Sequence, residues 1–587
     1  MSDANICWIG GPVLRARCRG PFRLNESVLV GDRGLLGEVI RLDGEEITVQ
    51  VFEDTTGLRP GDLVRGREQP LAVLLGPGLL GQIFDGLLRP LRAYKGAFIK
   101  PGSMETPLSI RPFTPKVAPG EHVGAGEVIG KVTLPYTAVR TLNILTPPGV
   151  SGEVVSIVAE GEYSEDLELC SLRSKDGRLH SVNMIHWWPV RRPRPVAERR
   201  DIGPPMLTGQ RILDCLFPIA QGGKACVPGG FGTGKTVLLQ TVAKGADADC
   251  IVYVGCGERG NEMAGVLEEF PHLEDPRTGG PLMERMVVIA NTSNMPVAAR
   301  EASIYTGVTV AEYLRDQGLN VALMADSTSR WAEALREVSG RLGELPGEAG
   351  YPAYLSTRLA EFYERAGRVQ TLGGKSASLT IIGAVSPPSS DFSEPVTVHT
   401  KRYVRNFWAL NRKLAQARFF PAVDPLVSYS EDARDLELWW RKRGHPRWGE
   451  QRRRFLSLLE EQQRLERMAR ILGKDALPMA QRLVLFCADL VKEAFLRQSA
   501  SSENDRFTSP NRQIRMMVVL ERFLDAAQQV VEAGGDVEVL ARLPVLRRVQ
   551  RMGEDIPETS LELFDQLEKD LDLALSGLQS GQEGGNP

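Results

Sequence analysis

Residues 224–246 read KACVPGGFGTGKTVLLQTVAKGA: a short apolar run, a glycine-rich loop and a helix-forming stretch. Residues 229–236 of this stretch match the pattern G-x-x-x-x-G-K-[ST]. Glycines allow successive backbone N–H groups to converge on one anion, and the N-terminus of the following helix adds a favourable dipole. We therefore expect the loop to bind nucleotide phosphates, with Lys235 neutralising the β- and γ-phosphates and the Thr236 hydroxyl binding Mg²⁺.

The predicted nucleotide-binding residues are the whole loop and the residue after it: Gly229, Gly230, Phe231, Gly232, Thr233, Gly234, Lys235, Thr236 and Val237. The alternative interpretation is a glycine-rich turn with an exposed lysine. Chance matches to the pattern are rare at ordinary residue frequencies, and the strand before and helix after the loop are the context that the motif requires. A phosphate-binding loop is the better interpretation.

Strand and helix patterns alternate around this loop, between about residues 204 and 430. The apolar runs KACVP, DCIVYVG, MVVIA, NVALMAD and SLTIIGAV are short and mostly rich in valine and isoleucine. Runs of this kind are typical of buried parallel strands, and the segments between them, such as 297–319, have helical patterns. The alternation predicts a parallel sheet covered by helices on both faces.

Two acidic residues stand at the ends of these runs. Asp326 ends NVALMAD, where it could hold Mg²⁺ at the carboxyl edge of the sheet or serve as a helix N-cap. Glu258 follows DCIVYVG, where it could orient the water that attacks the γ-phosphate, with Arg259 stabilising charge. A first-turn glutamate that favours the helix dipole is the alternative for Glu258.

The flanking regions differ in pattern. Residues 6–64 show short apolar runs separated by turn residues, which predicts a small β-barrel, and a second β-rich stretch runs from about 112 to 193. The segment WWPVRRPRPVAERR at 187–200 predicts a solvated, extended connector. After residue 431, apolar residues recur at helical spacing, and the end of the chain, 576–587, is expected to be disordered.

The composition is that of an ordinary globular protein, with 42% hydrophobic and 25% charged residues. A net charge of −3 lacks the basic excess expected of a nucleic-acid binder. The first residues predict no signal peptide, and the longest apolar region is too short and too interrupted for a membrane helix. The eight cysteines are scattered and form no zinc pattern, so we expect reduced thiols, and Cys226 lies in an apolar strand that disfavours a redox switch.

Several motifs closely resemble the catalytic A (alpha) subunit of V-type and archaeal-type rotary ATPases, including bacterial members. They are GGFGTGKT at 229–236, GCGERGNEM at 255–263, MADSTSRWAEALREVSGRL at 324–342, GYPAYLSTRLAEFYERAGRV at 350–369 and GAVSPPSSDFSEPVT at 383–397. The likeness covers almost the whole chain.

The resemblance implies a multidomain fold that matches the regions above. The domains would be an N-terminal β-barrel at 1–68, the start of the central domain at 69–111, a β-rich bulge insertion at 112–194, a RecA-like ATP-binding P-loop domain at 195–430, a C-terminal helical bundle at 431–575 and a disordered tail at 576–587. The bulge is the distinguishing feature, because the F-type catalytic subunit lacks it, as does the non-catalytic B subunit.

The resemblance also implies residue roles. Lys235, Glu258, Arg259 and Arg330 would be the catalytic side chains, and Thr236 and Asp326 would hold Mg²⁺. The adenine of ATP or ADP would lie against Phe420 and against the backbone near residues 496–500. The sequence departs from the family pattern at Gly230, where proline is usual, at Thr233, where eukaryotic members carry a cysteine, and over 495–510.

By resemblance, the chain would couple ATP hydrolysis or synthesis to proton or sodium transport by rotary catalysis. Its partners would be homologous B subunits in an alternating hexameric ring, rotor and peripheral-stalk subunits, and a membrane sector, with the chain a peripheral component at the cytoplasmic face. The rival interpretations are a RecA-type translocase of RNA or secreted protein and a non-catalytic nucleotide-binding subunit. The direction of the reaction and the identity of the ion depend on partners and gradient.

Overall fold

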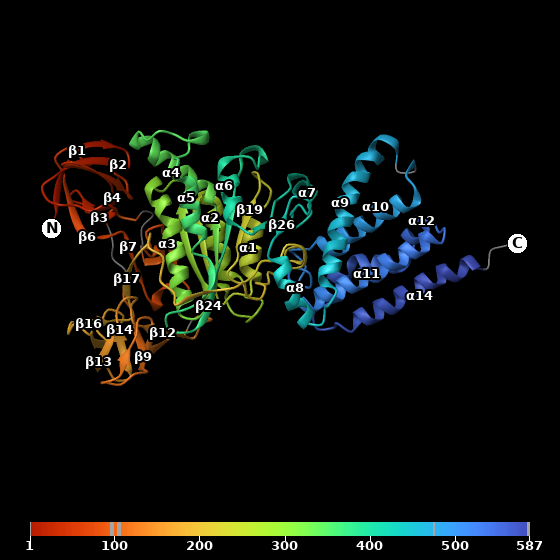
Figure 1. Cartoon of the computed structure of the whole chain (residues 1–587), viewed down its shortest axis with the longest axis horizontal. Coiled ribbons are helices and arrows are strands. Elements are labelled where there is room, and N and C mark those ends of the chain that lie inside the picture. The colour runs from red at the N-terminus through yellow and green to blue at the C-terminus, as the bar shows by residue number, and fades with distance from the viewer. Residues whose placement is uncertain (1, 94–98, 103–106, 136, 474–475, 584–587) are drawn as a thin grey trace. The chain divides into compact units, whose positions relative to one another are not determined.

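The computed structural model describes residues 2–93, 99–102, 107–135, 137–473 and 476–583 (Figure 1). The chain divides into two compact units, each built from three stretches of sequence. The first unit comprises Met1–Gly203, Gln221–Cys226 and Ala248–Val404, and the second comprises Pro204–Ala220, Val227–Asp247 and Arg405–Pro587. The glycine-rich loop therefore belongs to the second unit, whereas Glu258 and Asp326 belong to the first.

The first unit begins with a closed, six-stranded antiparallel β-barrel, as the sequence predicts. The order around the barrel is β1-β2-β5-β4-β3-β6, where the strands are β1 (Asp3–Gly10), β2 (Val13–Cys18), β3 (Glu26–Val30), β4 (Leu35–Asp43), β5 (Glu46–Val51) and β6 (Leu63–Pro70). Val28, Val39, Ile47 and Val49 are buried in its core. Pairing of β6 with both β1 and β3 closes the ring, so that both edges of the sheet are hydrogen-bonded.

The β-rich insertion consists of two four-stranded antiparallel sheets. One sheet has the order β10 (His122–Val123), β13 (Gly152–Ile157), β15 (Cys170–Arg173), β16 (Leu179–Val182). The other has the order β12 (Thr141–Leu145), β11 (Val128–Thr133), β9 (Ile110–Pro115), β14 (Gly161–Ser164). The last strand of the predicted β-rich stretch, β17 (His186–Pro189), joins neither sheet and pairs instead with β7 (Ala72–Leu75).

A parallel sheet forms the centre of the first unit. In it, β8 (Ile83–Phe84), β21 (Met286–Thr292), β20 (Cys250–Glu258), β22 (Asn320–Asp326) and β24 (Ser376–Val385) are consecutive neighbours, and each pair is parallel. The short strands β23 (Gly367–Gln370) and β18 (Glu198–Arg200) add antiparallel pairs beside β24. The valine, isoleucine and leucine side chains of these strands are buried on both faces of the sheet.

The helices of the first unit follow these strands: α2 (Gly260–Glu269), α3 (Val297–Asp316), α4 (Thr328–Leu342), α5 (Leu355–Tyr363) and α6 (Pro395–Tyr403). Helices α3 and α4 pack against the sheet and against each other (Figure 1). Because α4 begins directly after β22, its first turn lies at the carboxyl edge of the sheet.

In the second unit, the glycine-rich loop runs from β19 (Lys224–Pro228), whose last two residues belong to this unit, into α1 (Lys235–Gly245). A π-helical turn, η3 (Ile212–Leu216), precedes β19. Later in the chain, β25 (Asn406–Phe407) pairs with β26 (Tyr429–Ser430), and the connection between them contains α7 (Arg412–Gln416).

The C-terminal part of the second unit is helical, as the sequence predicts. Its helices are α8 (Ala433–Lys442), α9 (Trp448–Leu472), α10 (Met479–Val491), α11 (Pro510–Glu532), α12 (Val537–Ala541), α13 (Pro544–Asp555) and α14 (Leu563–Glu583), with a π-helical turn η9 (Lys492–Leu496) after α10. Apolar faces of these helices meet around Met516, Leu520, Phe523 and Leu567, which are buried. Among the residues described, no helix has both the length and the apolar character needed to cross a bilayer.

The predicted disordered tail differs from the structure. Helix α14 continues to Glu583, beyond residue 576, where the sequence predicts that order ends. Phe564, Leu567, Leu571 and Leu575 anchor the earlier turns in the core. Once a helix is nucleated, each added residue gains a backbone hydrogen bond, which favours continuation of the helix beyond these turns. Residues 584–587 lie outside the described part of the chain.

Candidate active site

The glycine-rich loop has an open backbone cradle. Gly232 and Gly234 have φ angles of +74° and +88°, a region that side chains other than glycine rarely adopt. A Cβ atom built on either residue would have no neighbouring atom within 4 Å, so the space beside this backbone is open. Phe231 is exposed, and Thr233 is buried with its hydroxyl donating to the Gly230 carbonyl at 2.8 Å.

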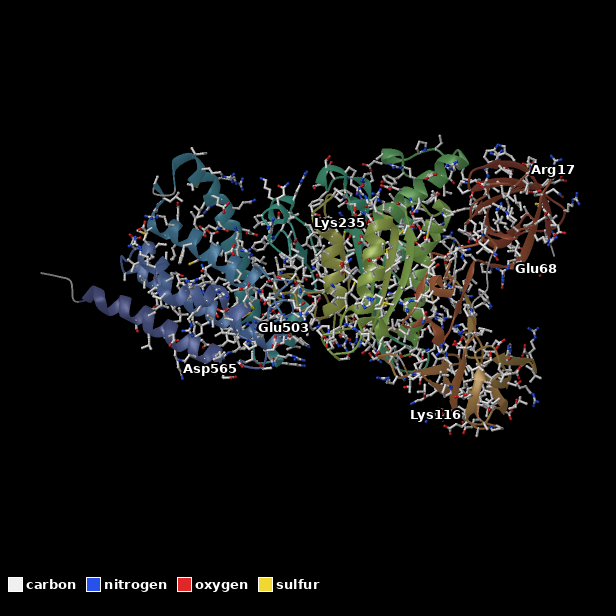
Figure 2. The ribbon with its side chains drawn as sticks, turned by 180° about the vertical axis from the view of Figure 1, so that it is seen from behind. Arg17, Glu68, Lys116, Lys235, Glu503 and Asp565 are labelled. Atoms are coloured by element: carbon white, nitrogen blue, oxygen red, sulfur yellow. The ribbon has the colours of Figure 1, made fainter. Side chains whose placement is uncertain are left out.

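Lys235, labelled in Figure 2, is the first residue of α1 and folds back over the loop. Its ammonium group donates to the carbonyl oxygens of Gly229 at 2.9 Å and Gly230 at 3.0 Å. Thr236 and Val237 follow in the first turn of α1, where helical N–H groups lack intrahelical partners. This arrangement suits a triphosphate, because an open cradle, a helix N-terminus and one ammonium group meet at the same place.

The two predicted carboxylates stand on neighbouring parallel strands of the first unit. Glu258 is the last residue of β20 and Asp326 is the last residue of β22, with Gly255 opposite Asp326 in the ladder. Asp326 is buried, and the Tyr253 hydroxyl donates to its Oδ2 at 3.2 Å. A carboxylate on this edge is a hard oxygen donor of the kind that Mg²⁺ prefers.

The sequence leaves open whether Asp326 is a helix N-cap and whether Glu258 belongs to the first turn of a helix. The observed helix boundaries answer both questions. Ser327, and not Asp326, is the N-cap residue of α4. Arg259 is the N-cap residue of α2, and the acidic residue of its first turn is Glu262. Glu258 therefore belongs to the strand, and an interaction with the helix dipole explains Glu262 rather than Glu258.

The environment of Glu258 favours the neutral form of its carboxyl group. Burial, followed by the negative charge of Asp326 and by a hydrogen bond with Glu262, raises the pKa of Glu258 to about 8, while the positive charge of Arg330 opposes the shift. Arg330 is half-exposed and forms an ion pair with Glu333 at 2.9 Å. A carboxyl group with a pKa near neutrality is able to change protonation state during a reaction.

Phe420 lines a cavity of about 640 Å³ in the second unit. Gln498, Ser499 and Ala500 line the same cavity, so the structure brings together the two segments that the resemblance connects with adenine. The backbone N–H of Gln498 donates to the Phe420 carbonyl at 2.8 Å. The segment that carries Phe420 also lies at the base of the glycine-rich loop, because the Leu410 N–H donates to the Pro228 carbonyl at 2.8 Å.

Sequence reasoning missed two residues of these sites. Glu262 shares a hydrogen bond with Glu258 across the junction between β20 and α2, where neither strand nor helix spacing signals the contact. Arg211 lines the cavity beside Phe420, but its main partners lie almost 300 residues away in the sequence, so no local signal pointed to it.

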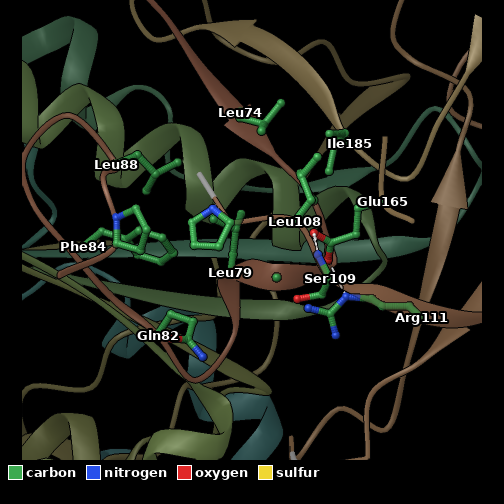
Figure 3. A pocket seen from close by; sticks show the side chains of 14 residues that line it. Leu74, Leu79, Gln82, Phe84, Leu88, Leu108, Ser109, Arg111, Glu165 and Ile185 are labelled. Carbon is green, nitrogen blue, oxygen red and sulfur yellow. Dashed lines mark hydrogen bonds and ion pairs between the residues drawn. The ribbon is translucent and has the colours of Figure 1, made fainter. Parts of the chain in front are cut away.

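A second cavity, of about 200 Å³, lies in the first unit near the strands that lead into the β-rich insertion. Leu74, Leu79, Phe84 and Ile185 make much of its wall apolar, and Arg111 forms a partly buried ion pair with Glu165 at one side (Figure 3). None of the predicted site residues lines this cavity.

Cys226 is fully buried in β19, and burial raises the pKa of its thiol far above the ordinary value. Reactive thiols need exposure and a positive environment, so this geometry disfavours a redox switch next to the loop.

A strand, an open glycine-rich loop and a helix, in a chain that also contains a helix-covered parallel sheet, define a P-loop nucleotide-binding protein of the RecA-like class. Four family models match the chain in order: "ATP synthase alpha/beta family, beta-barrel domain" at 6–67, "ATPsynthase alpha/beta subunit barrel-sandwich domain" at 111–191, "ATP synthase alpha/beta family, nucleotide-binding domain" at 209–430 and "C-terminal domain of V and A type ATP synthase" at 437–540. The chain belongs to the ATP synthase alpha/beta family.

Curated relatives resemble the chain over nearly its whole length. The A subunit of the A-type ATP synthase from Methanopyrus kandleri is 50% identical over 576 residues, which is 97% of each chain. The V-type ATP synthase alpha chain of Halothermothrix orenii is 50% identical over 569 residues, 96% of each chain. A solved structure of EscN, the ATPase of the enteropathogenic E. coli type III secretion system, shares the fold with a TM-score of 0.63 at 23% identity, covering 88% of this chain and 99% of EscN.

Proposed function

We propose that the chain is the catalytic subunit of a rotary V-type or A-type ATPase/ATP synthase, coupling ATP hydrolysis or synthesis to proton or sodium transport. The observation that carries this proposal is the open phosphate cradle with Lys235 and Thr236. It occurs in a chain that is 50% identical to the A subunit of an A-type ATP synthase over 97% of its length. The likeness to EscN is a likeness of fold, and the full-length relatives favour the synthase over a translocase.

The phosphate-binding residues have defined tasks in this proposal. The N–H groups of the loop and of the first turn of α1 bind the phosphate oxygens, and Lys235 exchanges the carbonyls of Gly229 and Gly230 for the β- and γ-phosphates. Phe420 packs against the adenine ring. Mg²⁺, when bound, supplies positive charge next to the phosphates, and the Thr236 hydroxyl and the Asp326 carboxylate are suitable oxygen donors for it.

Glu258 orients the attacking water in this proposal. Because its pKa is raised to about 8, the ligand-free carboxyl group holds a proton near neutral pH, and added positive charge lowers that pKa toward ionisation. The ionised carboxylate then accepts a hydrogen bond from the water. Arg259 and Arg330 contribute positive charge on the same side of the first unit, Arg330 through its influence on Glu258.

The proposed assembly is an alternating ring with homologous B subunits, which supply the arginine that stabilises the transition state. Rotor and peripheral-stalk subunits connect the ring to a membrane sector, and the chain lies at the cytoplasmic face as a peripheral component. This chain by itself is therefore expected to hydrolyse ATP slowly. ATP-driven ion uptake into inverted vesicles carrying the whole complex, measured with and without sodium, identifies the ion.

Turnover of Mg-ATP by the chain reconstituted with a B subunit tests the site. Lys235→Ala should lose nucleotide binding, whereas Lys244→Ala, near the other end of α1, is the matched control. Glu258→Gln should bind nucleotide but lose turnover by about 100-fold or more, as expected when a group that acts mainly in the transition state is removed. Glu268→Gln, on the exposed side of α2, is its control. Full turnover by Glu258→Gln, or normal binding by Lys235→Ala, contradicts the corresponding role.

A further inference from the structure

The wall of the cavity beside Phe420 includes an irregular segment. Residues 497–509 connect η9 to α11 without forming a helix or strand. Gln498, Ser499 and Ala500 in this segment line the cavity together with Phe420. Regular backbone hydrogen bonding does not hold the segment, so its conformation depends on side-chain contacts.

Arg211 supplies many of those contacts. It is the N-cap residue of η3, only 1% of its side chain is exposed, and it lines the cavity. Its Nε donates to the Phe495 carbonyl at 2.6 Å and its Nη2 donates to the Arg497 carbonyl at 2.6 Å. Its Nη1 forms an ion pair with Asp505 and donates to the Thr508 hydroxyl at 3.1 Å. One planar guanidinium therefore connects both ends of the irregular segment.

The partners of Arg211 hold the cavity-lining residues in turn. The Ser499 N–H donates to the Asp505 carboxylate at 2.6 Å, so the ion pair with Arg211 also orients Ser499. The backbone N–H of Arg211 donates to Gln498 Oε1 at 2.9 Å, and the Gln498 N–H donates to the Phe420 carbonyl. These contacts form a continuous chain from η3, through 495–508, to Phe420.

We propose that Arg211 is the positioning residue for the nucleoside end of the site. It fixes 495–508 against Phe420 and thereby sets the affinity for the base and sugar of the nucleotide, while the glycine-rich loop binds the phosphates independently. This inference rests on the proposed function, which assigns the cavity to the nucleoside. Removal of the guanidinium leaves a buried carboxylate without its cationic partner and takes one donor from each of two backbone carbonyls, so the segment is expected to rearrange.

Calorimetric titration of the full-length chain with two probes, Mg-ATP and Mg-tripolyphosphate, tests the inference. Tripolyphosphate presents the phosphates without a base or sugar. Arg211→Met should weaken ATP binding by about tenfold or more and leave tripolyphosphate binding within about twofold of the unaltered chain. Arg211→Lys keeps the positive charge but loses the planar guanidinium with its several N–H donors. This variant should lose an intermediate amount of ATP affinity and keep its tripolyphosphate affinity. Arg542→Met, which removes an arginine whose side chain is 82% exposed, is the matched control and should change neither affinity.

Three results overturn the inference: unchanged ATP affinity in Arg211→Met, an equal loss for ATP and tripolyphosphate, or an Arg542→Met variant that behaves like Arg211→Met. If Arg211→Met does not fold, Asp505→Asn decides, because it weakens the same ion pair while conserving shape. Selective loss of ATP affinity in Asp505→Asn supports the inference, and unchanged ATP affinity overturns it. Failure of the unaltered chain to bind either probe instead contradicts the proposed function.

Discussion

Arg191 joins the β-barrel to the parallel sheet through a buried triad with Glu38 of β4 and Glu301 of α3. Its Nη2 lies 2.7 Å from Glu38 Oε2 and 2.8 Å from Glu301 Oε2, and three further nitrogen–oxygen contacts measure 3.0 Å, 3.1 Å and 2.9 Å. The Glu38 and Glu301 side chains are 1% and 5% exposed. Arg191→Met removes the positive charge and conserves much of the side-chain volume, which leaves two buried carboxylates facing each other.

The free energy of unfolding of Arg191→Met should be lower by about 3–5 kcal/mol at pH 8, which is the range for removing one partner of a buried ion pair. Burial by itself would raise the pKa of Glu301, but the charge and hydrogen bonds of Arg191 outweigh it and lower that pKa. In the unaltered chain, the lowered pKa contributes stability above the unfolded value of about 4.5, and this contribution is lost only as pH falls through the folded pKa. In Arg191→Met, burial and mutual repulsion raise the carboxyl pKa, so the variant loses stability as pH rises above about 4.5.

Thermal unfolding at pH 5.5 and pH 8 measures this difference. The midpoint temperature of the transition in which the barrel unfolds should fall by about 10 °C at pH 8. A loss of 1 kcal/mol corresponds to about 2–4 °C for a large domain. The shift should be clearly smaller at pH 5.5. A triple variant that adds Glu38→Gln and Glu301→Gln removes the unpaired charges and should recover most of the lost stability. The control is Arg178→Met, which removes an arginine whose side chain is 80% exposed. Equal shifts at both pH values, or a triple variant no more stable than Arg191→Met, would refute the reasoning.

The raised pKa of Glu258 predicts that the ligand-free chain loses stability as pH rises from about 5 through 8, because the folded state then binds more protons than the unfolded state. Glu258→Gln should flatten that dependence in thermal unfolding, and parallel curves for the two proteins would argue against the shift. Phe420→Ala should weaken ATP binding by roughly tenfold in a fluorescence titration, since base stacking contributes about 1–3 kcal/mol, whereas Phe420→Trp should bind nearly normally. In the native chain, exposed Cys7 should react with an alkylating reagent well before buried Cys226, as peptide mass spectrometry would show, and equal labelling would contradict the burial of Cys226.

The connector at 187–200 shows where sequence reasoning failed. Its arginines and prolines predict a solvated connector, yet Arg191 is mostly buried and Arg194 is 2% exposed in an ion pair with Asp316 at 2.6 Å. The carboxylate partners of both arginines lie more than 100 residues away in the sequence. A local pattern records the charge of a residue but not the distant carboxylate that neutralises it.

Local patterns were sufficient for the P-loop and the strands around it. The strand, loop and helix at 224–246 were predicted from sequence because each depends on neighbouring residues: β19 on a short apolar run, the loop on glycine φ angles, and α1 on a helix-forming stretch. Glu258 and Asp326 were predicted as strand-end carboxylates for the same reason, since apolar runs mark where strands stop. Only the tertiary structure decided that burial, with Asp326 and Glu262, raises the pKa of Glu258, and that Arg211 contacts the segment that lines the cavity with Phe420. Those properties depend on burial and on contacts between distant segments, and neither is encoded in the spacing of residues along the chain.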